Sequence, residues 1–316
     1  MLLYYYINKV IFCKHFFTLF SFSYLFKISM AELIITFLKG NVRTMDWIYG
    51  KTILITGASS GLGRAMTVKL IKEHNCKVIG IGISEPKMRS LIDELSYQKD
   101  AFLYELFDVG IKENWVRFSE KIKAEKINID ILINNAGILP PFDKSFNYSE
   151  EQVEKCMNTN FHSCRYAINT MLPILRHSTM PGIVNISSSD ALVPIVGTSI
   201  YSASKAALKA YSEALIGELG REMYIGYVCP GFIKTDIFRN QYTISKSTLI
   251  TMASTNVDKA ASKIIKKIIK QKSRMIVGKD AKFMNFTSKF FPVLGLKFYE
   301  QIIKSSNIKM FDNVRY

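Results

Sequence analysis

The sequence predicts an α/β protein whose doubly wound parallel sheet carries helices on both faces. Three observations support this class. Short β-branched and aliphatic runs alternate with longer amphipathic stretches after residue 51, a glycine-rich loop follows the first run, and 316 residues suffice for one large domain. Because a helix-length stretch separates each short run from the next, right-handed crossovers and parallel neighbouring strands are expected.

The first strand is expected at 52–56, where Thr-Ile-Leu-Ile-Thr is apolar at its centre, as in a strand buried on both faces. A helix follows at 64–74, with Met66, Val68, Leu70 and Ile71 on its apolar side. The strand signal returns at 77–83, 101–109, 130–134, 182–187, 224–229 and 274–278. Helices are expected near 86–99, 111–126, 149–176, 201–219 and 258–271. Ligands should bind beyond the carboxyl ends of the strands.

The net charge of +16 at pH 7 is spread unevenly over the chain. Residues 1–44 carry five lysines and arginines against one acid, 45–258 carry 23 against 22, and 259–316 carry 14 against three. A basic tail of this kind either faces an anionic surface or is simply solvated. Since no zinc-finger spacing, RNP-like strand or Gly-x-x-Gly clamp accompanies it, we predict no nucleic-acid partner.

The five cysteines are scattered and odd in number, at positions 13, 76, 156, 164 and 229. They form no CxxC pair and no cysteine–histidine cluster with zinc spacing. We therefore expect no disulfide framework, no metal and a reducing, cytoplasmic location.

Residues 1–44 form an N-terminal extension rich in Phe, Tyr, Ile, Leu and Lys. Lys9, Lys14 and Lys27 interrupt it, so it lacks the run of about 20 apolar residues that a membrane span needs, and it has no small-residue cleavage site. Three interpretations stay open: a membrane-interacting segment, a disordered or interfacial extension, or a mis-assigned start upstream of Met45. We place the folded domain at 45–280 and a C-terminal tail at 281–316.

The loop Thr56-Gly57-Ala58-Ser59-Ser60-Gly61-Leu62-Gly63 joins the first strand to the first helix. Glycines allow a tight turn and a close approach of backbone N–H groups to a pyrophosphate, and a helix N-terminus favours negative charge. This context favours dinucleotide binding over a glycine-rich turn that binds nothing.

Tyr201 and Lys205 lie four residues apart in an expected helix, so their side chains share one face. An ammonium beside a phenol favours the phenolate, which would let Tyr201 give or take a proton near neutrality. Alone, such a pair is usually part of an ordinary helix face, so whether it is catalytic depends on the motifs in the rest of the chain.

In order and spacing, Gly57-x-x-x-Gly61-x-Gly63, Asn134-Asn135-Ala136-Gly137 and Tyr201-x-x-x-Lys205 resemble the motifs of the short-chain dehydrogenase/reductase family. The resemblance covers about 45–280. It implies a seven-stranded Rossmann-type sheet that binds NAD(H) or NADP(H), and an oxidoreductase. It also implies assembly into a homodimer or homotetramer through the helices at 149–176 and 201–219.

The resemblance assigns cofactor contacts residue by residue. The pyrophosphate falls to the glycine loop, the adenine to the end of the third strand, and the nicotinamide to the turn after the sixth. The implied cofactor residues are Gly57, Ser59, Ser60, Gly61, Leu62, Gly63, Asp108, Val109, Asn135, Ala136, Gly137, Tyr201, Lys205, Pro230, Gly231, Ile233 and Thr235.

The resemblance also implies four catalytic residues, Asn160, Ser188, Tyr201 and Lys205. Ser188 is selected among three consecutive serines because it lies thirteen residues before Tyr201, and it would hydrogen-bond the substrate oxygen. Asn160 would hold a water in a proton relay, with a buried structural amide as the alternative. Tyr201 would exchange the proton, and Lys205 would lower the Tyr201 pKa and hold the nicotinamide ribose.

The family's usual cofactor determinants are absent, since the relevant positions are Gly82, Ile83 and Ser60. Without a carboxylate to repel a 2′-phosphate, and with Lys87 and Arg89 nearby, NADP(H) is favoured over NAD(H).

The tail after Gly278 combines lysines with a dense apolar set: Phe283, Phe286, Phe290, Phe291, Leu294, Leu296, Phe298 and Tyr299. It either packs on the domain, or covers a hydrophobic substrate or contacts a membrane surface. The leading functional hypothesis is a carbonyl reductase or alcohol dehydrogenase for an apolar small molecule, such as a steroid, bile acid or lipid-like ketone. The alternatives are a 3-oxoacyl reductase and a non-catalytic NAD(P)-binding adaptor, against which the complete catalytic set speaks.

Overall fold

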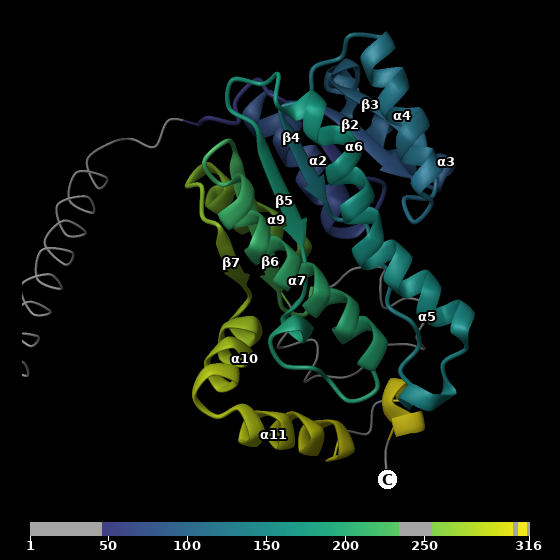
Figure 1. Ribbon diagram of the computed structural model, residues 1–316, viewed down its shortest axis with the longest axis vertical. Helices are drawn as coiled ribbons and strands as arrows, with labels where there is room; N and C mark the ends of the chain where they lie inside the picture. The colour runs from purple at the N-terminus through teal and green to yellow at the C-terminus, as the bar shows by residue number, and fades with distance from the viewer. Residues whose placement is uncertain (1–45, 234–254, 306–308, 315–316) are drawn as a thin grey trace, which may run out of the picture. The chain divides into compact units, whose positions relative to one another are not determined.

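The computed structural model describes residues 46–233, 255–305 and 309–314 (Figure 1). The predictions on the extension 1–44 and on Thr235 therefore fall outside the described residues. Within those ranges, no helix combines the length and the apolar character needed to cross a bilayer.

The sheet contains seven parallel strands in the order β3-β2-β1-β4-β5-β6-β7. Their bounds are β1 Thr52–Thr56, β2 Lys77–Gly82, β3 Phe102–Leu106, β4 Ile131–Asn134, β5 Gly182–Ile186, β6 Tyr224–Pro230 and β7 Arg274–Val277. The strand order reverses direction between β1 and β4, which makes the sheet doubly wound. The predicted seven-stranded Rossmann-type sheet is confirmed.

The helices that connect the strands lie where the amphipathic stretches predict them, within a few residues. They are α2 Gly61–His74, α3 Glu85–Leu95, α4 Lys112–Ala124, α5 Glu150–Met157, α6 Ser163–Leu175, α7 Ser199–Leu219 and α9 Val257–Ile269. Shorter helical turns are η1 Ser96–Ala101, η2 Ser145–Asn147, η3 Asn158–His162 and η4 Ser189–Ala191.

Helices cover both faces of the sheet, and β1 shows why (Figure 1). Successive side chains of a strand point to opposite faces. Ile53 and Ile55 pack in a cluster with residues of α2, α3 and α9, whereas Leu54 packs in a second cluster with residues of α4, α6 and α7. All three are at most 1% exposed. Burying such a side chain contributes about 1.5–3 kcal/mol to folding, so the apolar run of β1 is a strand buried on both faces.

The helix expected at 149–176 is divided by one wider turn. A capping box between Ser149 and Gln152 starts α5, and the π-helical turn η3 at Asn158–His162 joins α5 to α6. A π turn holds one residue more than an α turn. Here it surrounds Asn160, whose side chain is fully buried.

The tail is helical and packs on the domain. Gly278, with φ of +117°, turns the chain from β7 directly into α10 Lys279–Phe290, and α11 Pro292–Ser305 and η7 Lys309–Val314 follow. Figure 1 shows α10 and α11 beyond the carboxyl end of β7. Met284, Ile303 and Phe311 form a third apolar cluster with Phe142 and Ile195. The tail thus belongs to the same compact unit, which spans Asp46–Tyr316.

Candidate active site

One cavity of about 460 Å³ lies at the carboxyl ends of the central strands and extends from the glycine loop to Tyr201. Its wall includes thirteen of the predicted site residues: Gly57, Ser60, Gly61, Leu62, Asn135, Ala136, Gly137, Ser188, Tyr201, Lys205, Pro230, Gly231 and Ile233. A larger cavity of about 580 Å³ lies beside Trp47 and Tyr224 at the amino ends of β5 and β6, and none of the described site residues lines it.

The glycine loop has the backbone that a pyrophosphate site requires. Gly57 and Gly61 have φ of +68° and +52°, the left-handed region that favours glycine. A Cβ on Gly63 would collide with the carbonyl of Gly57, so the loop and the first turn of α2 can approach each other only with glycine there. Ser60 precedes α2 without capping it through its side chain. The free N–H groups of this helix start fit the phosphates of a dinucleotide.

The Asn134–Gly137 segment ties the end of β4 to the end of β1. The backbone N–H groups of Asn135 and Ala136 both donate to Thr56 Oγ1 at 2.9 Å, and Asn135 Nδ2 donates to the Thr56 carbonyl at 2.9 Å. Asn135 therefore holds the two loops together, while Ala136 and Gly137 form the cavity wall.

Five predicted residues lie off this wall. Asp108 turns the chain after β3, accepting the Gly110 N–H at 2.8 Å, and Val109 is buried, with its carbonyl bound to Trp115 Nε1 at 2.9 Å. Ser59, Gly63 and Asn160 do not line the cavity. Their predicted contacts with cofactor or water stay predictions.

Lys205 reaches the cavity through a gap that Gly137 leaves. A Cβ on Gly137 would lie 3.1 Å from Lys205 Nζ and 3.2 Å from Asn160 Oδ1. The ammonium donates to the Ile186 carbonyl at 3.0 Å and lies 5.9 Å from the centre of the Tyr201 ring. Burial lowers the Lys205 pKa, although neighbouring thiols and Asp190 oppose this shift.

The Tyr201 pKa differs from the expectation. Burial of the phenol, followed by the charge of Asp190, raises the Tyr201 pKa above its ordinary value, and the hydrogen bond from Ser188 only partly opposes this. We expected Lys205 to lower it, but burial and the charge of Asp190 determine the direction of the shift. Tyr201 is therefore a protonated donor at neutral pH, which suits proton delivery to a carbonyl oxygen.

Asn160 is bound on every side. Its Nδ2 donates to the Ile138 carbonyl and to Ser204 Oγ, both at 2.9 Å, and its Oδ1 accepts the Ile138 N–H at 2.8 Å. These contacts match the structural alternative, in which the amide anchors the loop after β4. The role in a water relay stays a prediction.

All three consecutive serines line the cavity, and Ser188 stays the predicted contact of the substrate oxygen. Ser187 Oγ donates to the Lys205 carbonyl at 2.7 Å and so braces α7. Ser188 Oγ accepts the Asp190 N–H at 3.1 Å, and its hydroxyl also lies 3.3 Å from Asp190 Oδ1. Asp190 lines the cavity as well, and the sequence reasoning missed it. A carboxylate two residues after the chosen serine was the available signal.

Within the parts of the chain that the structure describes, no group of three His, Cys, Asp or Glu side chains is placed to hold a metal ion. The four cysteines of these parts, Cys76, Cys156, Cys164 and Cys229, are buried and not paired in disulfides.

Comparison with known proteins agrees with this geometry. The family model for short chain dehydrogenases matches residues 51–246. The chain is 33% identical to a benzil reductase ((S)-benzoin forming) of Saccharomyces cerevisiae over 197 residues, which are 60% of this chain and 73% of the relative. It is 29% identical to human epidermal retinol dehydrogenase 2 over 252 residues, 78% of this chain and 80% of that protein. Its fold is similar to that of a short-chain dehydrogenase from Streptomyces avermitilis, with a TM-score of 0.67 and 24% identity over 80% of this chain and 98% of that one.

Proposed function

Since the chain belongs to the short-chain dehydrogenase family and is an NAD(P)-dependent oxidoreductase, we propose that it interconverts a carbonyl group and a secondary alcohol on an apolar small molecule. One observation carries the proposal. Ser188, Tyr201 and Lys205 line the same cavity as Gly57, Ser60 and Gly61 of the glycine loop. This supports a dinucleotide bound along the cavity with its nicotinamide end near the proton-transfer groups.

Each residue then has a separate task. When bound, the nicotinamide supplies or accepts the hydride. In the reductive direction Tyr201 donates its phenolic proton to the carbonyl oxygen, and the Ser188 hydroxyl hydrogen-bonds the same oxygen as negative charge develops there. Lys205 stays beneath the Tyr201 ring, positioned by the Ile186 carbonyl, with its charge close to the proton donor. Oxidation of the alcohol reverses these steps.

The substrate class follows from the wall beyond Tyr201. Leu139, Phe142, Ile195 and Phe232 line that end of the cavity, and burying apolar surface there favours binding by about 25 cal/mol per Å². None of the tail residues that the structure describes lines the cavity, but Met284 and Ile303 pack in one cluster with Phe142 and Ile195. The relatives named for benzil and retinol also support an apolar carbonyl or alcohol.

Cofactor oxidation measured over a ketone panel tests this function. We expect turnover of a bulky apolar ketone, such as a steroid, and of a small diketone. A 3-oxoacyl reductase would instead prefer a 3-oxoacyl thioester. An adaptor would bind cofactor and turn over none of them, although Ser188, Tyr201 and Lys205 are assembled as for chemistry.

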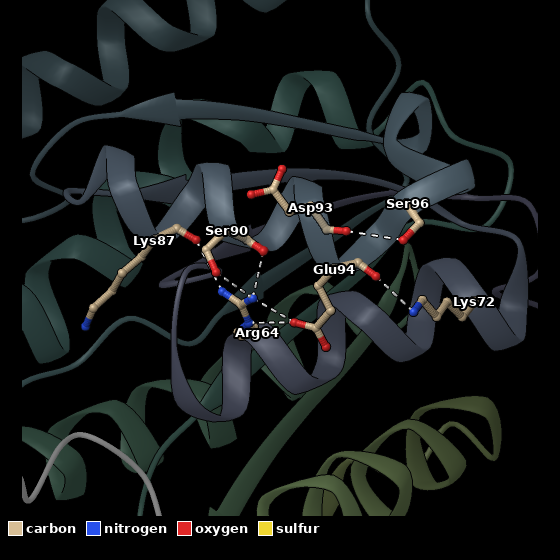
Figure 2. A network of polar contacts seen from close by, with 7 residues as sticks. All are labelled: Arg64, Lys72, Lys87, Ser90, Asp93, Glu94 and Ser96. Carbon is tan, nitrogen blue, oxygen red and sulfur yellow. Dashed lines mark hydrogen bonds and ion pairs between the residues drawn. The ribbon is translucent and has the colours of Figure 1, made fainter.

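We propose NADP(H) as the preferred cofactor, with Lys87 at its 2′-phosphate. Lys87, Ile83 and Ser60 line the cavity at the glycine-loop end, and the residue after Gly82 is Ile83, which carries no charge to repel a phosphate. Arg64 is unsuited to this role, because its guanidinium binds Glu94 Oε2 at 2.8 Å and the carbonyls of α3 (Figure 2). In Figure 2 the Lys87 side chain extends away from that network.

A surface on α10 and α11 supports contact with an anionic membrane, and we propose this contact for the C-terminal helices. Nine large apolar side chains there are 42–65% exposed: Phe283, Phe286, Phe290, Phe291, Val293, Leu294, Leu296, Phe298 and Ile302. Ring contacts of 5.0–6.1 Å link Phe290, Phe286 and Phe291, and Phe283 meets Phe298 across the two helices at 6.0 Å. Lysines 279, 282, 289, 297 and 304 lie on the same helices, which adds attraction to anionic lipid. Sedimentation with phosphatidylserine vesicles, compared with phosphatidylcholine vesicles, tests the contact.

We also propose that the protein assembles into a homodimer or homotetramer through α5–α6 and α7. We propose a cytoplasmic location with association at the membrane surface. Light scattering with a variant that carries a charge on the exposed face of α7 tests the assembly.

A further inference from the structure

A buried carboxylate, Asp190, borders the catalytic end of the cavity and has no part in the mechanism above. It lies in η4, two residues after Ser188, and is 7% exposed. Among the described residues no lysine or arginine pairs with it. Its oxygens are held by hydroxyls instead, with Ser188 Oγ 3.3 Å from Oδ1 and Thr198 Oγ1 3.2 Å from Oδ2. Burying a charged carboxylate without a hydrogen-bond partner destabilises a protein strongly, so these two hydroxyl contacts stabilise Asp190 in its buried position.

Ser188 cannot donate to Asp190, to the Tyr201 oxygen and to a substrate oxygen at once. A serine hydroxyl has one hydrogen to donate, and its oxygen already accepts the Asp190 N–H at 3.1 Å. An ionised carboxylate is a stronger acceptor than a carbonyl oxygen. While Ser188 donates to Asp190, the substrate oxygen receives a hydrogen bond from Tyr201 alone.

We propose that Asp190 is a positioning residue whose protonation state decides whether the Ser188 hydroxyl proton faces the carboxyl group or the substrate oxygen. This inference rests on the proposed carbonyl and alcohol chemistry. When Asp190 is neutral, its own O–H can donate to Ser188 Oγ, which leaves the Ser188 proton for the substrate. The result is a chain of hydrogen bonds directed at the carbonyl oxygen, and such chains strengthen each member. When Asp190 is ionised, Ser188 donates to the carboxylate instead of accepting from it, and the hydrogen bond from Ser188 to the substrate oxygen is lost.

The change falls in an accessible pH range. Burial raises the Asp190 pKa to about 6, although hydrogen bonds from Thr198, Ser188 and Ser189 oppose the shift. Above that pH the carboxylate is ionised and competes for Ser188, so reductive activity should be high below about pH 6 and fall as the pH rises through it.

Other titratable groups lie on the elements that pack against η4. Helix α7 contributes Tyr201 and Lys205, β6 ends beside the Cys229 thiol, and α10 begins with Lys279 and Asp280. Burial raises the pKa of Cys229 to about 12, outside the range of the test. Burial also raises the Asp280 pKa, but Asp280 Oδ2 accepts the Phe232 N–H and makes no bond to Ser188. Asp280 is therefore the matched control.

The test is kcat/KM for ketone reduction between pH 5 and 9. In the wild type we expect a fall of about 10²-fold centred near pH 6, the lower end of the effect of losing one oxyanion donor. Asp190→Asn, which stays neutral, should remove this fall and reduce the ketone faster than wild type at pH 8 by the same factor. Asp280→Asn should keep the fall. Thr198→Val removes one donor from the carboxylate and should move the midpoint to higher pH.

A merely structural role predicts the opposite for Asp190→Asn, an equal loss at every pH. That outcome, or a flat wild-type profile, overturns the inference. If Asp190→Asn does not fold, judged by fluorescence titration with NADPH, an unmoved midpoint in Thr198→Val overturns it as well. Failure of the proposed function is separate, because the wild type would then reduce no ketone at any pH.

Discussion

Replacing Tyr201 with Phe isolates the proton donor of the proposed reaction. The substitution removes one oxygen and keeps the ring, which is partly buried and lies above Lys205 Nζ at 5.9 Å. Neither remaining polar group replaces the lost acid. Lys205 is bound to the Ile186 carbonyl, and the Ser188 hydroxyl has Asp190 as a competing acceptor.

The expected loss in kcat is about 10²- to 10⁴-fold, the usual contribution of general acid–base catalysis, which corresponds to about 3–5 kcal/mol in the barrier. Stability should change little, by about 1 kcal/mol for one hydrogen bond. The dissociation constant of NADPH, measured by fluorescence titration, should stay within about threefold of wild type by the same reasoning, because the ring and the Lys205 contacts are kept.

Tyr211→Phe provides the matched control. Tyr211 lies on the same helix, α7, but packs edge-on against Phe161 at 5.9 Å and not against the cavity. Its loss of a hydroxyl should leave kcat unchanged. If kcat of Tyr201→Phe lay within about threefold of kcat of Tyr211→Phe, the loss would be far smaller than the loss expected from removing a general acid. That result would refute Tyr201 as the proton donor.

Three further outcomes are expected. Lys87→Glu should shift the ratio of kcat/KM for NADPH over NADH toward NADH by at least about tenfold, because a carboxylate repels the 2′-phosphate, and an unchanged ratio would remove Lys87 from the cofactor site. Ile303→Ala should cost about 2–4 kcal/mol of unfolding free energy in urea and raise KM for a bulky apolar ketone more than for a small diketone, since it leaves a void behind Phe142; equal KM changes would mean that the tail only braces the domain. Asp130 is partly buried, which by itself raises its pKa, but bonds from Ser178, the Thr52 N–H and Lys51 together lower it. This contribution to stability is therefore present above about pH 4 and lost as the pH falls further, so Asp130→Asn should flatten the acid side of a plot of urea midpoint against pH.

The sequence predicted the strands and the glycine loop because those features are local. The run at 52–56 is apolar on both faces wherever it occurs, and Gly57 and Gly61 mark left-handed backbone without knowledge of their neighbours. The Tyr201 pKa was predicted in the wrong direction for the opposite reason. It depends on burial and on Asp190, which another loop brings to the phenol.

The tail shows the same limit in a different form. Its aromatic residues indicated an apolar surface, but which of them would be covered depended on the loop at Phe142 and on η4, more than 80 residues away in the chain. Met284 and Ile303 became core residues, while the neighbouring phenylalanines stayed exposed. Spacing within a helix cannot distinguish these two outcomes when both faces are apolar.

The wide turn at Asn158–His162 helps the continuous helix formed by α5, η3 and α6 to keep one stripe of its side chains in the core. Cys156, Asn160, Cys164 and Ile168 follow one another every four residues, and each is at most 2% exposed. In a regular α-helix with 3.6 residues per turn, each step of four advances the side chain by about 40°, so the fourth member would drift by about 120° from the first. The added residue of η3 absorbs part of that drift. Deleting Thr159, which keeps Asn160, would therefore shorten the wide turn to a regular one and rotate α6 against the sheet, turning Ile168 and Met171 away from the core.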